Sequence, residues 1–529
     1  MGRSTCALIF LVLGFNVLAL PGTSASAWKG FYEAPTGLGA LKLTFSHEGA
    51  AWKGVCEFPE LDGENSFPIR DLTLSDANVS FIVAVESRQM RFSGKFGVDK
   101  IDGTYEMFRD GKSTYVGEWG VKRGPAASAG TISATTPGKV TKTHSQSPPT
   151  DRKSVAEFPS PTGPFVVGRT TFYWQDPTRR ETLATDPDAK RELMVTLWYP
   201  GKKENGSVPA IYFPNYRLIA GQSPAPLPAS LRAHAFEQAP VARSSKRFPV
   251  VLFSHGLGEN TSRYSAQLEE LASYGYIVAA IDHTYDNQAV VFPDGRVARW
   301  SNRWEWAFAS DGPDQQLFIF ARLRVIVGDV SFVVDQLQRL NDEPSGRFNG
   351  KLDLGRLGFF GHSLGGAIAP LVCQTDLRFK SCLNQDGVPT GQVVILDSAK
   401  GKLERPFMFL ASRDLVTEET LQLMALTRAE YEKHYRAWQR HAYHVLDTLP
   451  VESYVISINN ATHGSFTDNP TLAADSLRTY RKRARTLQVI RDYTRAFFDK
   501  YLTGKNPALV DSAPYPEVTI ARYGVRATR

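Results

Sequence analysis

The sequence predicts an α/β protein with a mostly parallel sheet flanked by helices, preceded by a small antiparallel all-β domain. Beyond residue 190, short apolar runs of strand type alternate with helical segments, which is typical of a parallel sheet with right-handed crossovers. Residues 28–123 instead alternate polar and apolar positions, with turn residues at regular intervals. Residues 124–162, rich in Ala, Ser, Thr, Pro and Lys, separate the two patterns as a flexible linker.

The N-terminal residues have the composition of a secretory signal. Arg3 precedes an apolar stretch at 7–20, and Ala25 and Ala27 form an A-x-A cleavage site. The apolar stretch is too short for a membrane span, so we expect a secreted or periplasmic protein whose mature chain begins near Trp28. The expected divisions are a signal peptide at 1–27, an all-β domain at 28–123, a linker at 124–162 and a catalytic domain at 163–529.

The all-β domain is predicted to be an antiparallel meander closed as a small barrel or sandwich. Stretches such as 41–45 and 79–85 alternate along the chain with glycine-containing turns between them. Their aromatic residues are expected to form the core and cross-strand pairs, although stacking on sugars or lipids is an alternative.

The catalytic domain shows a strand and helix alternation that two segments interrupt. Insertions at the carboxyl ends of strands build lids and acyl pockets in such sheets. The segment 285–312 carries Trp300, Trp304, Trp306 and Phe308, and we expect it to form an apolar wall over the site. The other interruption is 211–247; strands are expected at 192–200, 248–254, 276–282 and 356–361, and helices at 261–273, 314–340 and 473–502.

A Gly-x-Ser-x-Gly motif at 361–365 is the strongest functional signal. The apolar run 357–360 leads into it, and Gly366 and Ala367 follow, so that a helix can pack closely against the strand. This arrangement is typical of the nucleophile elbow of α/β-hydrolases, which exposes a serine hydroxyl on a sharp turn. The motif predicts that Ser363 is a nucleophile.

An oxyanion hole is predicted from two backbone amides. The apolar strand at 248–253 ends in the sequence Ser-His-Gly-Leu-Gly, and the loop after this strand supplies one amide in α/β-hydrolases, here that of Leu257. The residue after the nucleophile, Leu364, supplies the other. His255 precedes the serine in the chain, so we expect it to shape this loop rather than to act as the base.

The base and its orienting acid are expected downstream of the serine. His463 lies in a polar loop after the strand-like stretch 454–458, where the fold places its base. Asp386 and Asp414 each follow a predicted strand, and either could hold the imidazole in its productive tautomer. Spacing alone favours neither carboxylate.

The motifs at 253–258, 274–283, 361–366 and 384–387 together resemble the plasma-type (isoform II) platelet-activating factor acetylhydrolase family, in a bacterial-type form, over roughly residues 160–505. In that family the acid follows the strand after the elbow helix, which implies Asp386. The resemblance implies hydrolysis of short or oxidised acyl esters of phospholipids without metal or organic cofactor, and contact with a lipid surface is a further option. The alternatives are a general carboxylesterase on small or polymeric esters and, more remotely, a non-catalytic surface binding protein.

The positive charge does not indicate nucleic acid. The net charge of +7 is spread along the chain, and no nucleic-acid-binding motif is present. The densest basic run, 478–485, is expected to be a solvated helix face, with an anionic-membrane patch as the alternative. No carboxylate or cysteine completes a metal-binding set with His434, His441 and His444, so no metal site is expected there.

Three cysteines remain after the expected signal peptide. Cys373 and Cys382 flank the connection from the elbow helix to the next strand. They could form a disulfide in an oxidising compartment, or they could be two buried thiols, because only geometry decides between these states. Cys56 lies in the all-β domain.

Overall fold

The computed structural model describes most of the chain in two compact units. One contains the N-terminal strands together with residues 416–439, and the other contains residues 145–415 and 440–529. Nearly all of the expected signal peptide and most of the expected linker lie outside the described residues. These are 26–123 without the short gaps 35–36, 49–50, 60–64, 76, 86–87, 98 and 110, then 157–219, 230–309, 313–387, 403–413 and 418–524 without 444–445 and 447–448.

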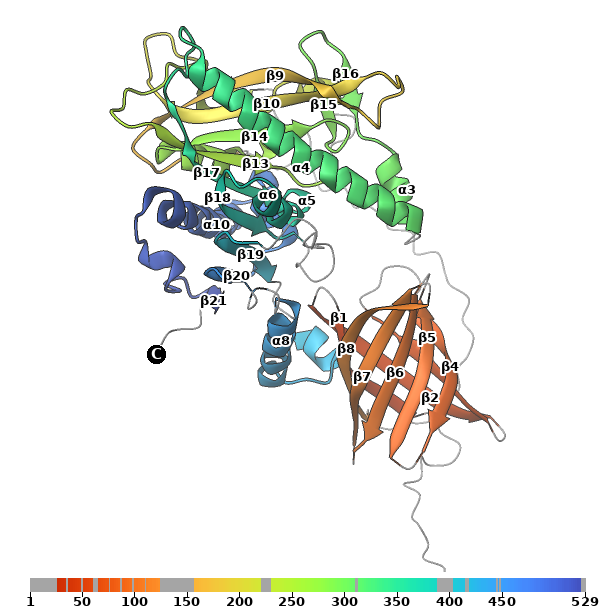
Figure 1. Ribbon diagram of the computed structural model, residues 1–529. Coiled ribbons are helices and arrows are strands. Elements are labelled where there is room, and N and C mark those ends of the chain that lie inside the picture. The colour runs from red at the N-terminus through yellow and green to blue at the C-terminus, as the bar shows by residue number, and fades with distance from the viewer. Residues whose placement is uncertain are drawn as a thin grey trace, which may run out of the picture. The chain divides into compact units, whose positions relative to one another are not determined.

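The N-terminal strands form a closed eight-stranded antiparallel barrel (Figure 1). Each strand pairs with the next in the chain, and β8 closes the barrel against β1. Aromatic side chains fill the interior, including Trp28, Phe92 and Trp119. This confirms the predicted all-β domain. The strands are β1 (Ser26–Ala34), β2 (Gly37–Glu48), β3 (Ala51–Glu57), β4 (Ser66–Leu74), β5 (Asn78–Val85), β6 (Arg88–Phe96), β7 (Lys100–Arg109) and β8 (Lys112–Arg123).

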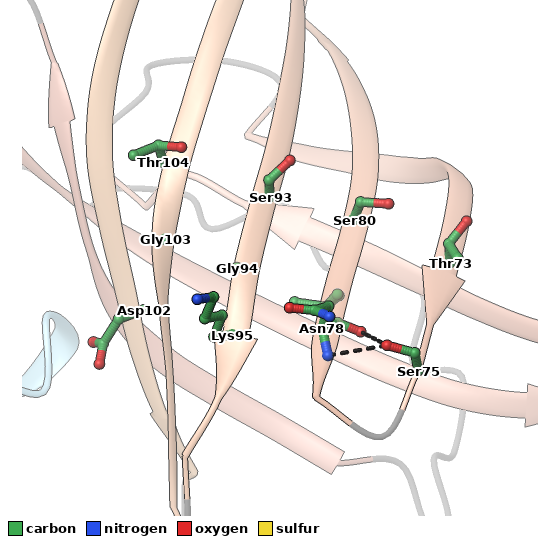
Figure 2. Close-up of a pocket in the computed structure, with 11 residues that line it drawn as sticks. Thr73, Ser75, Asn78, Ser80, Ser93, Gly94, Lys95, Asp102, Gly103 and Thr104 are labelled. Carbon is green, nitrogen blue, oxygen red and sulfur yellow. Dashed lines mark hydrogen bonds between the residues drawn. The ribbon is translucent and has the colours of Figure 1, made fainter.

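A shallow groove of about 440 Å³ lies on the barrel (Figure 2). Its floor includes Gly94 and Gly103, which face each other across β6 and β7. A Cβ atom at Gly94 would lie 2.7 Å from the ring of Trp119, whose Nε1–H donates to the carbonyl oxygen of Ser93 at 3.1 Å. The glycine therefore makes room for the buried indole beneath the strands. The polar lining residues are Thr73, Ser75, Asn78, Ser80, Ser93, Lys95, Asp102 and Thr104.

Residues 416–439 pack with the barrel, although the sequence predicts one continuous catalytic domain from 163 to 529. Leu421 and Met424 bury their side chains in one cluster with Phe31 and Ala40 of the first two strands. Lys122 adds an ion pair with Glu430 at 3.1 Å. The sequence did not predict this contact, because the strands that bury the apolar face of this helical segment lie some 400 positions earlier in the chain. The helices are α7 (Glu418–Leu423) and α8 (Arg428–Ala442).

The larger unit is built on an eleven-stranded mixed sheet in the order β11-β12-β9-β10-β14-β13-β17-β18-β19-β20-β21. Neighbours from β14 to β20 run parallel, whereas β10 and β21 pair antiparallel with the strands beside them. This confirms the predicted fold class. The strands are β9 (Val166–Arg180), β10 (Lys190–Gly201), β11 (Pro209–Ile211), β12 (Arg232–Glu237), β13 (Phe248–Ser254), β14 (Ile277–His283), β17 (Leu352–His362), β18 (Phe379–Gln385), β19 (Phe407–Arg413), β20 (Ser453–Asn459) and β21 (Val518–Tyr523), with β15 (Ala289–Val291) and β16 (Val297–Arg299) forming a separate pair.

Helices cover both faces of this sheet (Figure 1). The apolar residues of α4 and α6 join one core cluster, and those of α2 and α10 join the other. The predicted helix at 261–273 begins with a 3₁₀ turn, and the last long helix begins at Leu477 because Ser476 caps it by accepting the N–H of Thr479. The helices are α1 (Tyr216–Ile219), η2 (Thr261–Tyr264), α2 (Ser265–Ser273), α3 (Arg303–Ala309), α4 (Pro313–Asp342), α5 (Leu364–Ala367), α6 (Ala369–Thr375), η5 (His463–Phe466), α9 (Asn469–Leu472), α10 (Leu477–Thr503) and η6 (Ala508–Val510).

Cys373 at the end of α6 and Cys382 in β18 are joined by a disulfide, with their Cα atoms 6.1 Å apart. This decides between the two states that the sequence leaves open. Cys56 is a buried free thiol in the barrel, and burial raises its pKa. Among the described residues no helix has both the length and the apolarity that a membrane crossing requires.

Candidate active site

Ser363 lies on a strained turn between β17 and α5. Its backbone has φ 54° and ψ −116°, a conformation that non-glycine residues rarely adopt. The glycines around it follow from close backbone contact, because a Cβ at Gly361 would lie 2.3 Å from the carbonyl carbon of Gly365, and a Cβ at Gly365 would lie 2.1 Å from Ser254 O. The motif therefore forms a sharp strand-to-helix turn with the serine at its apex.

His463 and Asp386 are hydrogen-bonded to each other. His463 begins the 3₁₀ turn after β20, and its Nδ1 lies 2.7 Å from Asp386 Oδ2, just beyond the end of β18. The hydrogen bond to Asp386 raises the pKa of His463 despite partial burial. Burial on its own would raise the pKa of Asp386, but the hydrogen bonds from His463 and Ser412 outweigh it and lower that pKa. Asp386 is thus held as a carboxylate facing the imidazole.

Ser412 supports the carboxylate of Asp386 and was not identified from the sequence. Its backbone N–H donates to Oδ1 at 2.6 Å, and its hydroxyl donates to Oδ2 at 2.8 Å. The alternative acid, Asp414, lies outside the described residues. Ser363 directly follows β17, which lies next to β18 in the sheet. The order of the strands therefore brings the serine close to Asp386.

His362, the residue before Ser363, packs against His463, and the N–H of Ser363 donates to the carbonyl oxygen of Gln385 at 2.9 Å, next to Asp386. The ring centroids of His362 and His463 are 4.5 Å apart, and Ser363 follows His362 directly. Within the part of the chain that the structure describes, Ser363 Oγ makes no hydrogen bond. Such bonds are often long in unliganded enzymes and tighten when substrate binds. The serine is half-buried, and the side chain of His463 is 57% exposed, so both are accessible from solvent.

The two predicted oxyanion donors lie on the loops beside the serine. Leu257 follows β13, and Leu364 is the first residue of α5. Neither backbone N–H has an acceptor among the described residues. Leu364 opens α5, and the first N–H groups of a helix have no acceptor within it. Both amides are therefore available as hydrogen-bond donors.

A chain of buried hydrogen bonds joins the loops that carry these groups. The N–H of Gly256 donates to Tyr264 Oη at 3.0 Å, and the Tyr264 hydroxyl donates to His362 Nδ1 at 3.0 Å. The opposite nitrogen, Nε2 of His362, donates to the carbonyl oxygen of His463 at 3.0 Å. Burial and the nearby His463 lower the pKa of His362 to about 3, which keeps it neutral. His362 is visible in the sequence as part of the Gly-x-Ser-x-Gly motif. No sequence pattern indicates that Tyr264 is its hydrogen-bond partner.

A second set of serine, histidine and aspartate lies behind the oxyanion loop. Ser254 Oγ is 2.9 Å from His283 Nε2, and His283 Nδ1 is 2.8 Å from Asp329 Oδ2. All three side chains are buried, and Asp329 also pairs with Arg191 at 2.6 Å. The N–H of His283 donates to His255 Nε2 at 3.1 Å, and burial lowers the pKa of His255 to about 4. His255 is therefore a neutral, buried part of the loop.

The expected aromatic wall is only partly formed by the tryptophans of 285–312. Trp300 borders the oxyanion loop, because a Cβ at Gly258 would lie 3.4 Å from its ring. Trp304 is instead buried, and its Nε1–H donates to Asp286 at 3.0 Å. Trp306 packs on Phe318 of α4, and the side chain of Phe308 lies outside the described residues. Trp304 points inward because a buried carboxylate such as that of Asp286 requires hydrogen-bond donors, and the indole N–H supplies one.

Across the residues that the structure describes, no three His, Cys, Asp or Glu side chains are grouped so as to hold a metal ion. His434 instead lies with its ring centroid 4.1 Å from that of Phe31 on the barrel. The side chains of His441 and His444 are outside the described part.

Comparisons with known proteins find sequence similarity to acetylhydrolases and esterases. The family model "Platelet-activating factor acetylhydrolase, isoform II" matches residues 151–294. The platelet-activating factor acetylhydrolase of Cavia porcellus is 26% identical over 282 residues, which are 48% of this chain and 60% of that protein. A relative from Arthroderma benhamiae, named "Probable 1-alkyl-2-acetylglycerophosphocholine esterase", is 25% identical over 68% of this chain and 92% of its own length.

Among solved structures, a ferulic acid esterase from Streptomyces cinnamoneus matches with a TM-score of 0.52 and 29% identity, covering 68% of this chain and 98% of that one. The chain spans less than two thirds of the Cavia relative but nearly all of this esterase. The comparisons confirm the resemblance drawn from the motifs: the chain is similar to the isoform II platelet-activating factor acetylhydrolases, and its larger unit has an α/β-hydrolase fold like that of an esterase.

Proposed function

We propose that this chain is a serine esterase that hydrolyses short or oxidised acyl esters of the platelet-activating factor type. The observation that carries the proposal is the strained backbone of Ser363, with the hydrogen-bonded pair of His463 and Asp386 beside it. A strained, half-buried serine next to an imidazole that a carboxylate orients is the arrangement that activates a hydroxyl for attack on an ester. The names of the acetylhydrolase relatives support the substrate class.

In the proposed mechanism Ser363 Oγ attacks the ester carbonyl while His463 Nε2 accepts its proton. Asp386 holds the Nδ1–H and stabilises the imidazolium that forms. The N–H groups of Leu257 and Leu364 donate to the developing oxyanion. His463 then returns the proton to the leaving alcohol, and a water molecule hydrolyses the acyl-serine by the same steps in reverse. The reaction uses only side chains and backbone amides of this chain.

We also propose that the protein is exported by the signal at 1–27. The disulfide between Cys373 and Cys382 supports this proposal, because disulfides persist mainly in oxidising compartments. N-terminal sequencing of protein recovered from the culture medium or periplasm tests it, with a mature terminus near Trp28 as the expected result. A protein that retains residues 1–27 would contradict the proposal.

A fluorophosphonate probe tests the nucleophile directly. We expect one covalent adduct per chain on the wild-type protein, mapped to Ser363 by peptide mass spectrometry, and no adduct on the Ser363→Ala variant. Labelling of the variant at another serine would contradict the assignment. The absence of labelling in the folded wild-type chain would favour the remote alternative of a non-catalytic binding protein.

A general carboxylesterase on small or polymeric esters is the second candidate. The similarity to the ferulic acid esterase favours it, since that structure matches over 98% of its length. Turnover of p-nitrophenyl esters, phosphatidylcholines with short and long sn-2 chains, and feruloyl esters separates the two. A higher kcat/KM for the short sn-2 phospholipids supports the first candidate, and a preference for feruloyl esters supports the second.

A further inference from the structure

A groove of about 770 Å³ runs along the side of the loop that carries His463. One wall is the beginning of α10, and the other is the chain from Asn460 to Ala473. Thr462 and Ser465, which bracket His463 in its 3₁₀ turn, both line the groove. The groove therefore begins beside the proposed base. Its further polar and charged lining residues are Thr467, Asn469, Thr471, Arg478, Thr479, Lys482, Arg483 and Thr486.

The helix wall of this groove is positively charged. Arg478 and Lys482 are one helical turn apart and lie on one face of α10, and Arg483 also lines the groove. The lining of the groove contains no Asp or Glu side chain. Within the described residues, the charged ends of Arg478 and Lys482 have no carboxylate partner. The groove thus presents cationic donors that the protein itself does not neutralise.

Arg483 is fixed in place without losing its charge. Its Nη1 donates to the carbonyl oxygens of Pro470 at 2.8 Å and Ala473 at 3.1 Å. Asp475, a fully exposed carboxylate before the helix, has its pKa lowered first by hydrogen bonds from Thr479 and Ser476 and more weakly by Arg483. Because Asp475 is exposed, water screens its negative charge, and it offsets only part of the positive potential of Arg483.

The same basic run contains cations that the protein does neutralise. Arg485 pairs with Glu517 at 2.9 Å, and its guanidinium lies 4.5 Å from the ring centroid of Tyr515. Arg481 is exposed and does not line the groove. The run at 478–485 is therefore not one uniform solvated face. Arg478 and Lys482, which line the groove, have no carboxylate partner among the described residues, whereas Arg485 outside the groove has one.

We propose that this groove binds the phosphate group of the ester substrate while the acyl carbonyl lies at Ser363. The inference rests on the proposed function, since it assigns the position of the substrate's charged part. Arginine and lysine are the side chains that bind phosphate through charge-assisted hydrogen bonds. A glycerophospholipid holds its phosphate only a few bonds from the sn-2 ester, and the groove borders the turn that carries His463 through Thr462 and Ser465.

Two substrates that differ in the phosphocholine group, present in one and absent from the other, test this proposal. We would measure kcat and KM for dibutyroylphosphatidylcholine, as monomers below its micelle concentration, and for dibutyroylglycerol. Lys482→Glu is compared with Arg481→Glu, which makes the same change of charge at the neighbouring position outside the groove. We expect Lys482→Glu to raise KM for the phospholipid about tenfold and KM for dibutyroylglycerol less than twofold. Arg481→Glu should change neither.

Equal effects of the two variants, or an unchanged phospholipid KM in Lys482→Glu, would overturn the proposal. It would also fail if Lys482→Glu affected only substrate in anionic vesicles, which would make the helix a membrane contact instead. If the wild-type chain hydrolysed neither ester, the proposed function would fail separately. Calorimetric titration of the full chain with glycerol phosphate then decides the groove, because binding that Lys482→Glu weakens and Arg481→Glu preserves supports it, and no binding overturns it.

Discussion

Two sets of serine, histidine and aspartate lie in the larger unit, and they differ in burial, in backbone conformation and in their hydrogen bonds. In the set of Ser254, His283 and Asp329, the hydrogen bonds of 2.9 and 2.8 Å are complete, and every member is buried. In the set of Ser363, His463 and Asp386, only the bond between histidine and aspartate is formed.

The difference shows that a complete hydrogen-bond pattern does not make a serine reactive. Ser254 ends a regular strand and is fully buried, whereas Ser363 has a φ of 54° and is half-buried. The amides of Leu257 and Leu364 also have no acceptor among the described residues. Access for substrate, a strained turn and free donors separate a candidate catalytic set from one that holds a loop in place.

Replacing the two serines should separate the sets most strongly. We expect Ser363→Ala to lower kcat for a p-nitrophenyl ester by about 10⁴- to 10⁶-fold, because it removes the nucleophile. Ser254→Ala should keep kcat within about tenfold and lower the free energy of unfolding by about 1–3 kcal/mol, because it leaves a buried imidazole nitrogen without its donor. Steady-state kinetics and urea denaturation check both. Near-normal turnover in Ser363→Ala would reject the assignment.

The two aspartates that could orient His463 give the next largest contrast. Asp386→Asn should lower kcat by about 10⁴-fold, because an amide at this position favours the wrong histidine tautomer. Asp414→Asn serves as the control and should remain near wild-type activity. The reverse result would assign the acid to Asp414 and would weaken the family resemblance as a guide to this site.

Asp329 should matter for stability rather than for the chemical step. Its carboxylate faces Arg191, Arg179 and His283, all within 2.9 Å. We expect Asp329→Asn to lower the free energy of unfolding by about 3–5 kcal/mol, because it removes the carboxylate charge that faces buried Arg191 and leaves this arginine with Glu181 and Asp286. Chemical denaturation measures this effect. A variant of unchanged stability that has lost activity would place this buried set in the reaction instead.

Tyr264 should have a smaller effect, confined to the arrangement of the loops. Tyr264→Phe removes the bridge between Gly256 and His362 without changing the ring. We expect kcat to fall about tenfold with KM nearly unchanged, because the oxyanion donor next to Gly256 loses its support. Thr494→Val is a control that removes another buried hydroxyl from the same unit. Equal losses in both variants would indicate a general loss of stability.

The pH dependence of kcat/KM should show the smallest effect. His463 must be neutral to accept a proton, and its hydrogen bond to Asp386 raises its pKa above the ordinary value of 6.5. Activity should therefore increase with pH through a pKa above 6.5, and Asp386→Asn should move this limb to lower pH. His362, with a pKa of about 3, should contribute no limb between pH 5 and 9. A wild-type limb below 6.5 would contradict the pairing.

Much of the architecture was predictable because it depends on local patterns. Alternation of period two gave the barrel strands, and apolar runs between helical stretches gave the parallel sheet. The elbow was also predictable, since Gly361 and Gly365 are required by backbone contacts closer than 2.5 Å that no side chain permits. Ser363 and His463 could also be identified as candidates, because the order of the triad residues along the chain and their positions after strands can be read from the sequence.

Local patterns along the chain were enough to predict the fold class, the elbow and a short set of candidate site residues. Four contacts could be found only in the folded chain: Asp386 with His463, Ser412 with the same carboxylate, Cys373 with Cys382, and residues 416–439 with the barrel. Each of these joins segments whose contact depends on sheet order and on the exact path of a loop. Local patterns specify which face of an element is buried, but the partner across that face is set by how the whole chain packs.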